Sequence, residues 1–332
     1  MTLTQKKCKL CGSIFIGEGE ICRNCKTIDP LMPGYFESQE ILKGYIEPTE
    51  AEVVEEYDEP EIAIIVTTLN KWDYTYETLR TLYATVKEDF ELIVVDGNST
   101  DGTRNKIKNN FPDAYVIKLD RPYWISYAWN VGLEKALSTK AKYIGILNND
   151  LVFDGDWLTP ILDTFDDLHV GMVSPLQVDL KKTQQTTGRN RIEYADYSYY
   201  VPKNSIIPFT WVVGFCFFLR REAVEQIGGF DEQFFFGGDE VDYCLRLWAR
   251  GWKVVCNSYS EVMHHKTITL RETVIERRKE LEEIYGVEYI HPRKYFYEKY
   301  SIDFLDSVYK TIKAEQDNIG IELAKKVDLT WR

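Results

Sequence analysis

The chain has 332 residues, a formal net charge of −13 and a pI near 5.0. Its 44% hydrophobic and 14% aromatic residues suit a packed core and exclude a disordered chain. The acidic balance disfavours nucleic acid or anionic membrane as a partner, because both would need clustered Lys and Arg. No apolar run approaches the roughly 18 residues of a transmembrane helix, and no signal-peptide pattern opens the chain. We therefore expect a soluble, cytoplasmic protein with one main domain and small flanking units.

The chain opens with two Cys-x-x-Cys pairs that lie ten residues apart, Cys8 with Cys11 and Cys22 with Cys25. Paired cysteines at this spacing are typical of metal binding in a reducing compartment, not of disulfides. Four thiolates complete a tetrahedral Zn²⁺ shell and leave no open position for catalysis. Residues 1–30 are therefore predicted to form a structural zinc ribbon. The ribbon could recognise a protein or nucleic-acid acceptor, or only stabilise the terminus.

An acidic linker separates this ribbon from the main domain. Residues 31–60 contain nine acidic side chains and one lysine, together with three prolines. The main domain is predicted to span residues 61–270. The last part of the chain, residues 271–332, has a helical pattern and is predicted to form a C-terminal appendage or an oligomer contact.

Within the main domain, apolar runs alternate with helical patterns. Strands are predicted in chain order at 62–68, 90–96, 114–120, 143–150, 171–178, 211–220 and 253–265. Helices are predicted at 74–86, 124–138 and 241–250. The βαβα order of the first half predicts an α/β fold with a parallel sheet.

Polar residues follow four of these strands, where an open parallel sheet binds its ligands. They are Thr67 to Asn70, Asp96 to Asp101, Asn148 to Asp150, and the pair His264 and His265. These four places are the first candidates for a ligand site.

The second place reads VVDGNSTDGT and combines Asp96 with a glycine-bearing loop that a nucleotide can approach closely. The Asp96 carboxylate could accept a hydrogen bond from a pyrimidine N–H or from ribose. The alternative is an ordinary βα turn, in which Ser99 or Asp101 caps the next helix.

The fourth strand ends in LNND, so that Asp150 follows an apolar strand and two amides. A carboxylate there suits a hard divalent cation that bridges diphosphate oxygens and neutralises a leaving group. The alternative is an Asx turn at the end of a strand.

Together these segments resemble the family 2 inverting glycosyltransferases with the GT-A fold, especially the rhamnosyltransferase-like branch. IIVTTLNKWDY and VVDGNSTDGT are similar to that family's nucleotide-binding segments, and LNND to its metal-binding motif. The block from Trp211 to Val254 resembles its acceptor-side segment and is the most specific match. The resemblance covers residues 61–270 and implies a nucleotide-diphospho-sugar transferase fold, with a mixed, mostly parallel sheet flanked by helices.

The resemblance also implies site residues. The nucleotide would contact Thr67, Thr68, Asn70, Asp96, Asn98, Asn130 and Asn149. Asp150 would ligate Mg²⁺ or Mn²⁺ with help from one histidine. Neighbouring strand residues point to opposite faces, so only one histidine can reach the site, and we favour His264 over His265.

An inverting transfer needs a base that deprotonates the acceptor hydroxyl, and the acidic pair Asp239 and Glu240 is the candidate. The family usually carries Glu-Asp here, so Glu240 takes the position of its catalytic Asp, while Asp239 stays an alternative. Both carboxylates could instead only interact with the dipole of the following helix. On that helix, Asp242 and Arg246 are four residues apart and could form an ion pair.

The sequence thus predicts a glycosyltransferase that moves a sugar from a UDP- or dTDP-linked donor to a glycan or another hydroxyl-bearing acceptor. One alternative is a glycosyltransferase that acts on modified DNA or another macromolecule presented by the zinc ribbon. Another is a non-catalytic scaffold that binds nucleotide sugars.

Overall fold

The computed structural model describes residues 60–185, 200–234, 237–265 and 292–320, and the backbone of a few short strands beyond them. Among these, β1 (Gln5–Lys7) pairs antiparallel with β2 (Ile14–Ile16), and β10 (Tyr197–Tyr199) with β15 (Lys325–Val327). The four zinc-ribbon cysteines and nearly all of the acidic linker lie outside the described residues. The zinc site therefore stays a prediction.

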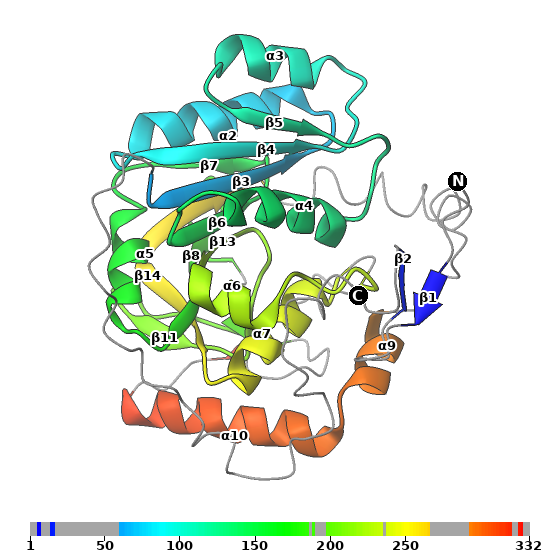
Figure 1. Ribbon diagram of the computed structural model, residues 1–332. Helices are drawn as coiled ribbons and strands as arrows, with labels where there is room; N and C mark the ends of the chain where they lie inside the picture. Colours follow the sequence, from blue (N-terminus) through cyan, green and yellow to red (C-terminus); the bar gives the residue numbers. More distant parts are fainter. Residues whose placement is uncertain are drawn as a thin grey trace.

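A mixed sheet of nine strands forms the centre of the described chain (Figure 1). Its order is β11-β14-β8-β13-β6-β3-β4-β5, and β7 pairs with β14. The strands are β3 (Ile62–Thr68), β4 (Phe90–Asp96), β5 (Tyr115–Lys118), β6 (Tyr143–Leu147), β7 (Leu151–Val152), β8 (Val170–Val178), β11 (Ile206–Pro208), β13 (Cys216–Arg220) and β14 (Lys253–His264). Among these described strands only β7, β11 and β13 run against the others, so the sheet is mostly parallel, as predicted.

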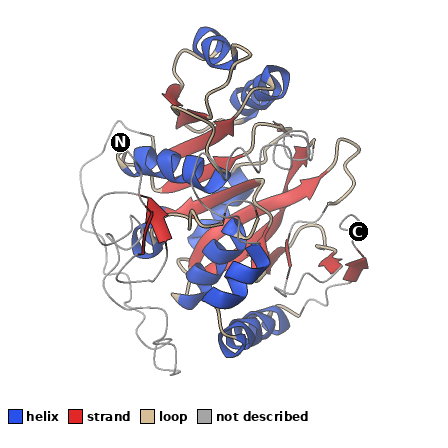
Figure 2. Cartoon of the chain, turned by 90° about the vertical axis from the view of Figure 1, so that its right-hand side faces the viewer, coloured by secondary structure: helices blue, strands red, loops and turns tan. Residues whose placement is uncertain are grey.

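Helices cover both faces of this sheet (Figure 2). They are α2 (Trp72–Thr85), α3 (Thr103–Asn110), α4 (Ile125–Leu137), α5 (Thr159–Asp163), α6 (Arg221–Ile227), α7 (Asp239–Ala249), α9 (Pro292–Lys299) and α10 (Ile302–Asn318). Helices α2, α3 and α5 pack on one apolar core, and α4, α6, α7, α9 and α10 on the other. The predicted βα units thus form, with boundaries within a few residues of those expected.

Strand β3 shows why two cores form. Its side chains alternate between the faces, so Ala63 and Ile65 join the α4 side while Ile64 and Val66 join the α2 side. All four are fully buried. An apolar run without alternation, as the sequence has here, is what a central strand buried on both faces requires.

The C-terminal helices pack onto the main domain. Phe296 of α9 and Val308 and Ile312 of α10 belong to the same core cluster as α7. Helix α10 lies along β11 and α7 at the lower end of the sheet (Figure 1). Its amphipathic pattern therefore has a partner surface within this chain.

The predicted strand over 211–220 is interrupted. Strand β12 (Trp211–Val212) pairs with β9 (Gly188–Arg189), outside the main sheet, and β13 starts only at Cys216. Between them the chain makes a tight turn, in which the Phe215 N–H donates to the Val213 carbonyl at 2.9 Å. The break brings the turn to the candidate site described below.

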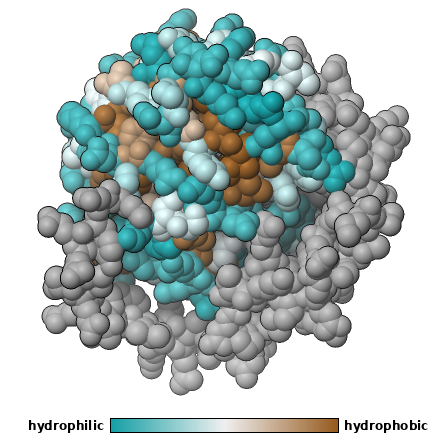
Figure 3. Space-filling view, turned by 45° about the horizontal axis from the view of Figure 1, so that its top comes forward, coloured by the Kyte–Doolittle hydropathy of each residue, from teal (hydrophilic) through white to brown (hydrophobic). Residues whose placement is uncertain are grey.

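The exterior agrees with the acidic, polar composition. Figure 3 shows a face that is mostly hydrophilic, with apolar side chains gathered near its centre. Across the described residues, no helix combines the length and the apolar character that a membrane crossing needs.

Candidate functional site

The loops that follow β3 and β4 hold each other in place. The Asn70 Oδ1 atom accepts from the backbone N–H of Thr100 at 2.8 Å, and the Ser99 Oγ atom accepts from the Asn70 N–H at 2.7 Å. Asn70 has a left-handed backbone, with φ 57°, which asparagine tolerates better than most residues. Two predicted nucleotide-binding loops are thereby fixed as one unit.

Asp96 ends β4 inside this unit and is fully buried. Its Oδ1 atom accepts from the Ser99 N–H at 3.0 Å, whereas its Oδ2 atom has no hydrogen-bond partner among the described residues. Asn98, with φ 70°, donates from its amide to the Asp120 carbonyl at 3.3 Å. A buried carboxylate oxygen without a donor is costly, so Oδ2 has an unmet hydrogen-bonding capacity at the end of β4.

Thr68 and Asn149 connect this unit to the loop after β6. The Asn149 amide donates to Thr68 Oγ1 at 3.2 Å and to Thr75 Oγ1 at 2.9 Å. Thr67 lies one residue earlier in β3, buried and paired with Val95 of β4. Three of the four predicted strand-end places therefore form one continuous polar layer.

The fourth place joins through Asp150 and His264. His264 Nε2 lies 3.0 Å from Asp150 Oδ1, and both residues are buried. On its other side, His264 Nδ1 lies 2.8 Å from Gln177 Nε2. His265 points elsewhere, with its Nε2 atom 2.8 Å from Glu77 Oε2 on α2. The structure thus places the side chain of the favoured histidine, and not that of its neighbour, beside the Asp150 carboxylate; His265 reaches Asp150 only with its backbone N–H, which donates to the Asp150 carbonyl at 3.0 Å.

The donor set of this pair fits a small divalent cation. A carboxylate and an imidazole suit Mn²⁺, and the carboxylate suits Mg²⁺. The Gln177 amide nitrogen donates to His264 Nδ1, which leaves the proton of a neutral ring on Nε2, facing Asp150. Ligation of a cation by Nε2 would need the opposite tautomer, with Nδ1–H donating to the Gln177 amide oxygen. Within the described part of the chain, no group of three or more His, Cys, Asp or Glu side chains could hold a metal. A cation at Asp150 and His264 would therefore take its remaining oxygen ligands from water or from a bound substrate.

The acidic pair lies at the start of α7, after Gly238, whose φ of 93° suits glycine. Asp239 is 3% exposed, and its Oδ2 atom has no partner among the described residues, while Glu240 is half-buried. Burial, the Glu240 charge and a hydrogen bond with Glu240 raise the pKa of the Asp239 carboxyl well above its usual range. The pair therefore combines a buried carboxyl whose pKa is raised with a more accessible carboxyl group.

The turn between β12 and β13 links the acidic pair to the Asp150 cluster. The Phe215 ring stacks on the His264 ring, with centroids 5.5 Å apart, and the Phe215 carbonyl accepts from the Asn148 N–H at 2.9 Å. A Cβ atom on Gly214 would lie 3.4 Å from Glu240 Cβ. Two consecutive residues thus contact both groups, so Glu240 and the Asp150 cluster belong to one site.

Asn130 is the predicted nucleotide contact that the structure places apart from the strand-end loops. Its amide nitrogen donates to the Phe230 carbonyl at 2.9 Å and to Glu232 Oε1 at 2.8 Å. Its amide oxygen accepts from the Phe230 N–H at 2.7 Å. The side chain is buried and committed to holding the 230–232 turn against α4.

The predicted ion pair between Asp242 and Arg246 is confirmed, with Arg246 Nε 2.8 Å from Asp242 Oδ2. Asp242 is fully buried, which by itself would favour its protonated form. The charges of Lys299 and Arg246 outweigh burial and lower the pKa of Asp242 to about 2. The helix that carries the acidic pair is thus held by buried charge one turn further on.

Several residues of the site were not predicted from the sequence. They are Thr75, Gln177, Gly214 and Phe215. Gly214 had a weak signal, because it interrupts an apolar run, and a glycine in a strand pattern often marks a close backbone approach. Gln177 had none, since it contacts His264 across 87 residues of sequence.

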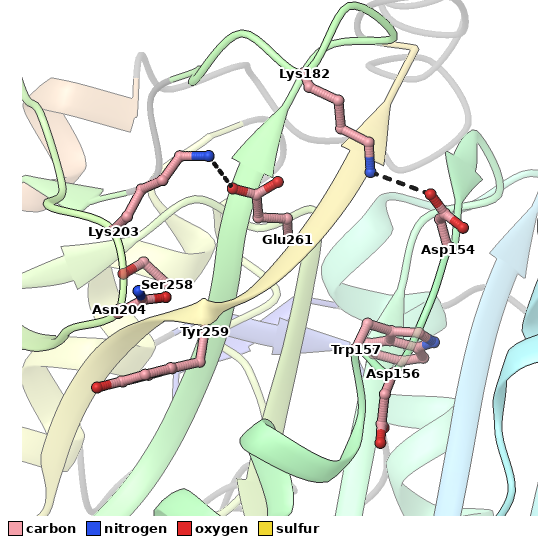
Figure 4. Close-up of a pocket in the computed structure, with 9 residues that line it drawn as sticks. All are labelled: Asp154, Asp156, Trp157, Lys182, Lys203, Asn204, Ser258, Tyr259 and Glu261. Atoms are coloured by element: carbon pink, nitrogen blue, oxygen red, sulfur yellow. Dashed lines mark ion pairs between the residues drawn. The ribbon is translucent and has the colours of Figure 1, made fainter.

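A separate polar pocket of about 230 Å³ lies beside β14 (Figure 4). It is lined by Asp154, Asp156, Trp157, Lys182, Lys203, Asn204, Ser258, Tyr259 and Glu261. Two ion pairs cross it, Lys182 with Asp154 and Lys203 with Glu261, each at 3.5 Å. None of the predicted site residues lines this pocket.

The fold places the chain in a structural class. It is similar to the solved structure of GalNAc-T7 with UDP, GalNAc and Mn²⁺, with a TM-score of 0.52 at 15% sequence identity. The match covers 79% of this chain and 56% of that one. The protein therefore has a GT-A-like fold, as predicted.

The family follows from the sequence match. Residues 63–228, half of the chain, match the model of glycosyl transferase family 2, and the chain belongs to that family.

Two curated relatives are similar over parts of the chain. The O-antigen biosynthesis protein RfbC of Myxococcus xanthus is 29% identical over 233 residues, which is 65% of this chain and 18% of the relative. The N-acetylglucosaminyl-diphospho-decaprenol L-rhamnosyltransferase of Mycobacterium tuberculosis is 44% identical over 59 residues, 18% of this chain and 19% of the relative. The chain thus spans less than a fifth of either relative.

Proposed function

We propose that this protein transfers a sugar from a nucleoside diphosphate donor to an acceptor hydroxyl, with inversion at the anomeric carbon. The observation that carries the proposal is the continuity of the site. Hydrogen bonds join the β3 loop to the loop that carries Asp150, and Asp150 contacts His264. Phe215 stacks on His264, and Gly214, one residue earlier, lies next to Glu240. A transfer reaction needs these three parts side by side: loops that bind the donor, a pair that would hold the metal at the leaving group, and a base that activates the acceptor.

The donor base would bind in the unit formed by the β3 and β4 loops. The unpartnered Oδ2 atom of Asp96 is suited to accept from the imino N–H of uracil or thymine, which supports a UDP- or dTDP-linked donor. Thr67, Thr68, Asn70, Asn98 and Asn149 surround the same strand ends. Asn130 is assigned to the support of the 230–232 turn instead.

Mg²⁺ or Mn²⁺ would be held by Asp150 and His264, and would neutralise negative charge on the departing diphosphate. The Mn²⁺ in the GalNAc-T7 structure supports this choice of metal class.

Glu240 would act as the base. It takes the acceptor proton as the acceptor oxygen attacks the anomeric carbon and the bond to the diphosphate oxygen breaks. The half-buried Glu240 is reachable by an acceptor, whereas Asp239 is buried and its pKa is raised. Asp239 would donate a hydrogen bond that orients the Glu240 carboxylate.

The test is a panel of nucleotide sugars, including UDP- and dTDP-linked donors and a rhamnose donor, assayed for binding, hydrolysis and transfer. Wild type is compared with Asp150→Ala, with added Mn²⁺ or Mg²⁺ and with chelator. We expect hydrolysis or transfer of one donor that needs the metal and falls by about 100-fold or more in the variant. Full activity in chelator would remove the metal from the mechanism. Donor binding without hydrolysis or transfer across a broad acceptor panel would instead favour a binding scaffold.

A further inference from the structure

Helix α9 and the residue after it bring three polar side chains onto two buried carboxylates of the acceptor-side block. Lys299 Nζ lies 2.7 Å from Asp231 Oδ2 and 2.6 Å from Asp242 Oδ1. The Tyr295 hydroxyl donates to Asp231 at 2.8 Å, and the Tyr300 hydroxyl donates to Asp242 at 2.7 Å. We call Tyr295, Lys299 and Tyr300 the C-terminal clamp.

The clamp supplies a charge that the block needs. Asp231 is 5% exposed and Asp242 is fully buried, so both carboxylates depend on nearby cations. Arg246 is committed to Asp242 and to the backbone carbonyls of Ile227 and Gly229, each at 2.8 Å. Lys299 is the cation that contacts both carboxylates, and they raise the pKa of its ammonium although burial opposes the charge.

The clamp also contacts the turn that precedes the acidic pair. The Tyr295 ring packs edge-on against Phe234, with centroids 4.8 Å apart, and Lys299 lies 5.6 Å from the centre of the Phe234 ring. On its other side, Phe234 abuts Gly238, where an added Cβ atom would lie 2.8 Å from Phe234 Cδ1. Gly238 is the residue before Asp239. The Phe234 ring therefore lies between α9 and the start of α7 and contacts both.

The acidic pair is therefore braced on both sides by the same three residues. Before the pair, the clamp holds Asp231 and Phe234; after it, the clamp holds Asp242, two residues beyond Glu240. The residues that contact the clamp lie beyond residue 228, where the family match ends.

We propose that Lys299, together with Tyr295 and Tyr300, is a positioning residue that fixes the backbone carrying Asp239 and Glu240 in the geometry needed for proton abstraction from the acceptor. This inference rests on the proposed transferase function. A general base must reach its proton within hydrogen-bond distance, and a shift of about 1 Å can cost about 100-fold in rate. The C-terminal helices thereby become part of the acceptor side of the site.

The test compares Lys299→Met, which removes the charge at similar length, with Lys299→Arg, which keeps it. Lys310→Met is the matched control, because Lys310 is exposed on α10. We expect Lys299→Met to lower kcat by about 10- to 100-fold. The dissociation constant of the nucleotide should stay within about twofold, because the clamp binds Asp231 and Asp242 of the acceptor-side block. Lys299→Arg should recover most of kcat, and Lys310→Met should match wild type.

A second readout does not depend on activity. Hydrogen exchange followed by mass spectrometry should show faster exchange in peptides that cover residues 229–245 of Lys299→Met, with unchanged exchange in β3 and β4. If Lys299→Met does not fold, Tyr295→Phe and Tyr300→Phe remove one hydroxyl each and should give the same pattern more weakly. Unchanged kcat and exchange in Lys299→Met would overturn the inference. So would parallel loss of nucleotide binding and of kcat, which indicates global destabilisation.

Failure of the proposed function is distinguishable from failure of this inference. If wild type transfers no sugar, the transferase proposal fails, while the exchange measurement still tests whether the clamp holds the segment.

Discussion

The donor side and the acceptor side of the site are stabilised by different kinds of interaction. On the donor side, the loops after β3, β4 and β6 are joined mainly by hydrogen bonds between neutral side chains and backbone, such as Asn70 with Thr100. On the acceptor side, buried charges dominate, with Asp231, Asp242, Arg246 and Lys299 in one network. Each neutral hydrogen bond contributes about 1 kcal/mol, whereas breaking a buried ion pair costs about 3 to 5 kcal/mol.

The difference suggests a division of labour. Neutral hydrogen bonds shape most of the donor-side loops, around the carboxylates of Asp96 and Asp150. Buried ion pairs instead fix the helix that carries Asp239 and Glu240. Loss of one neutral hydrogen bond on the donor side should therefore cost less stability than loss of one charge on the acceptor side.

The largest effect is expected from Glu240→Gln, which keeps the size of the side chain and removes the base. We expect kcat to fall by about 100- to 10,000-fold, with nucleotide affinity and thermal stability near those of wild type. The measurement is steady-state transfer with saturating donor. If Asp239→Asn abolishes transfer while Glu240→Gln retains it, Asp239 is the base and the roles are reversed.

Asp242 should make the acceptor side sensitive to acid. Its pKa in the folded protein, about 2, lies below its usual value of 3.8, so its stabilising effect is complete above about pH 4 and is lost as the pH falls toward 2. The corresponding loss is about 2 kcal/mol in the free energy of unfolding. Denaturant unfolding at pH 7, 4 and 3 measures it. Asp242→Asn should be less stable at pH 7 and lose less on acidification; an equal loss in both proteins contradicts the assignment.

Asp239, three residues earlier, should show the opposite trend. Its pKa is raised in the folded protein, so its contribution to stability is present below pH 3.8 and is lost as the pH rises toward its folded pKa. Asp239→Asn keeps the shape and removes the ionisation. We expect this variant to be more stable than wild type at pH 7 and to depend less on pH between 4 and 8. A variant that is less stable than wild type at pH 7 would show that the ionised form is stabilised.

The smallest effect is expected on the donor side, from Asn70→Ala. Loss of the acceptor for Thr100 N–H should cost about 1 to 2 kcal/mol of stability and weaken donor binding modestly. Asn70→Gly controls for the left-handed backbone, since glycine adopts φ 57° without strain. Asn70→Asp keeps an acceptor oxygen and should lie closest to wild type. If Asn70→Ala lowered the free energy of unfolding as much as Lys299→Met does, the contrast between the two sides would be lost.

Much of the donor side could be predicted because its signals are local. An apolar run followed by Thr67 to Asn70, or by Asp96 in a glycine-bearing loop, indicates both the strand and the ligand-facing end within a dozen residues. Alternation of side chains along a strand also indicated that only one of His264 and His265 could reach the site, and position after the strand favoured His264. Zinc binding by the four cysteines stays a prediction, because those residues lie outside the described part of the chain.

The sequence by itself determined most strands of the main domain, three of its helices, the mostly parallel α/β class and the family, since these depend on periodicity and on short motifs. It gave no bounds for α3, α5 or α6. Tertiary structure alone decided that Asn130 supports the 230–232 turn, that Gly214 and Phe215 join Glu240 to His264, and that α9 supplies a cation to Asp231 and Asp242. These contacts join residues from 26 positions apart, as with Gly214 and Glu240, to 102 positions apart, as with Asn130 and Glu232. Which distant side chains meet depends on how the elements pack, and no local pattern encodes that choice.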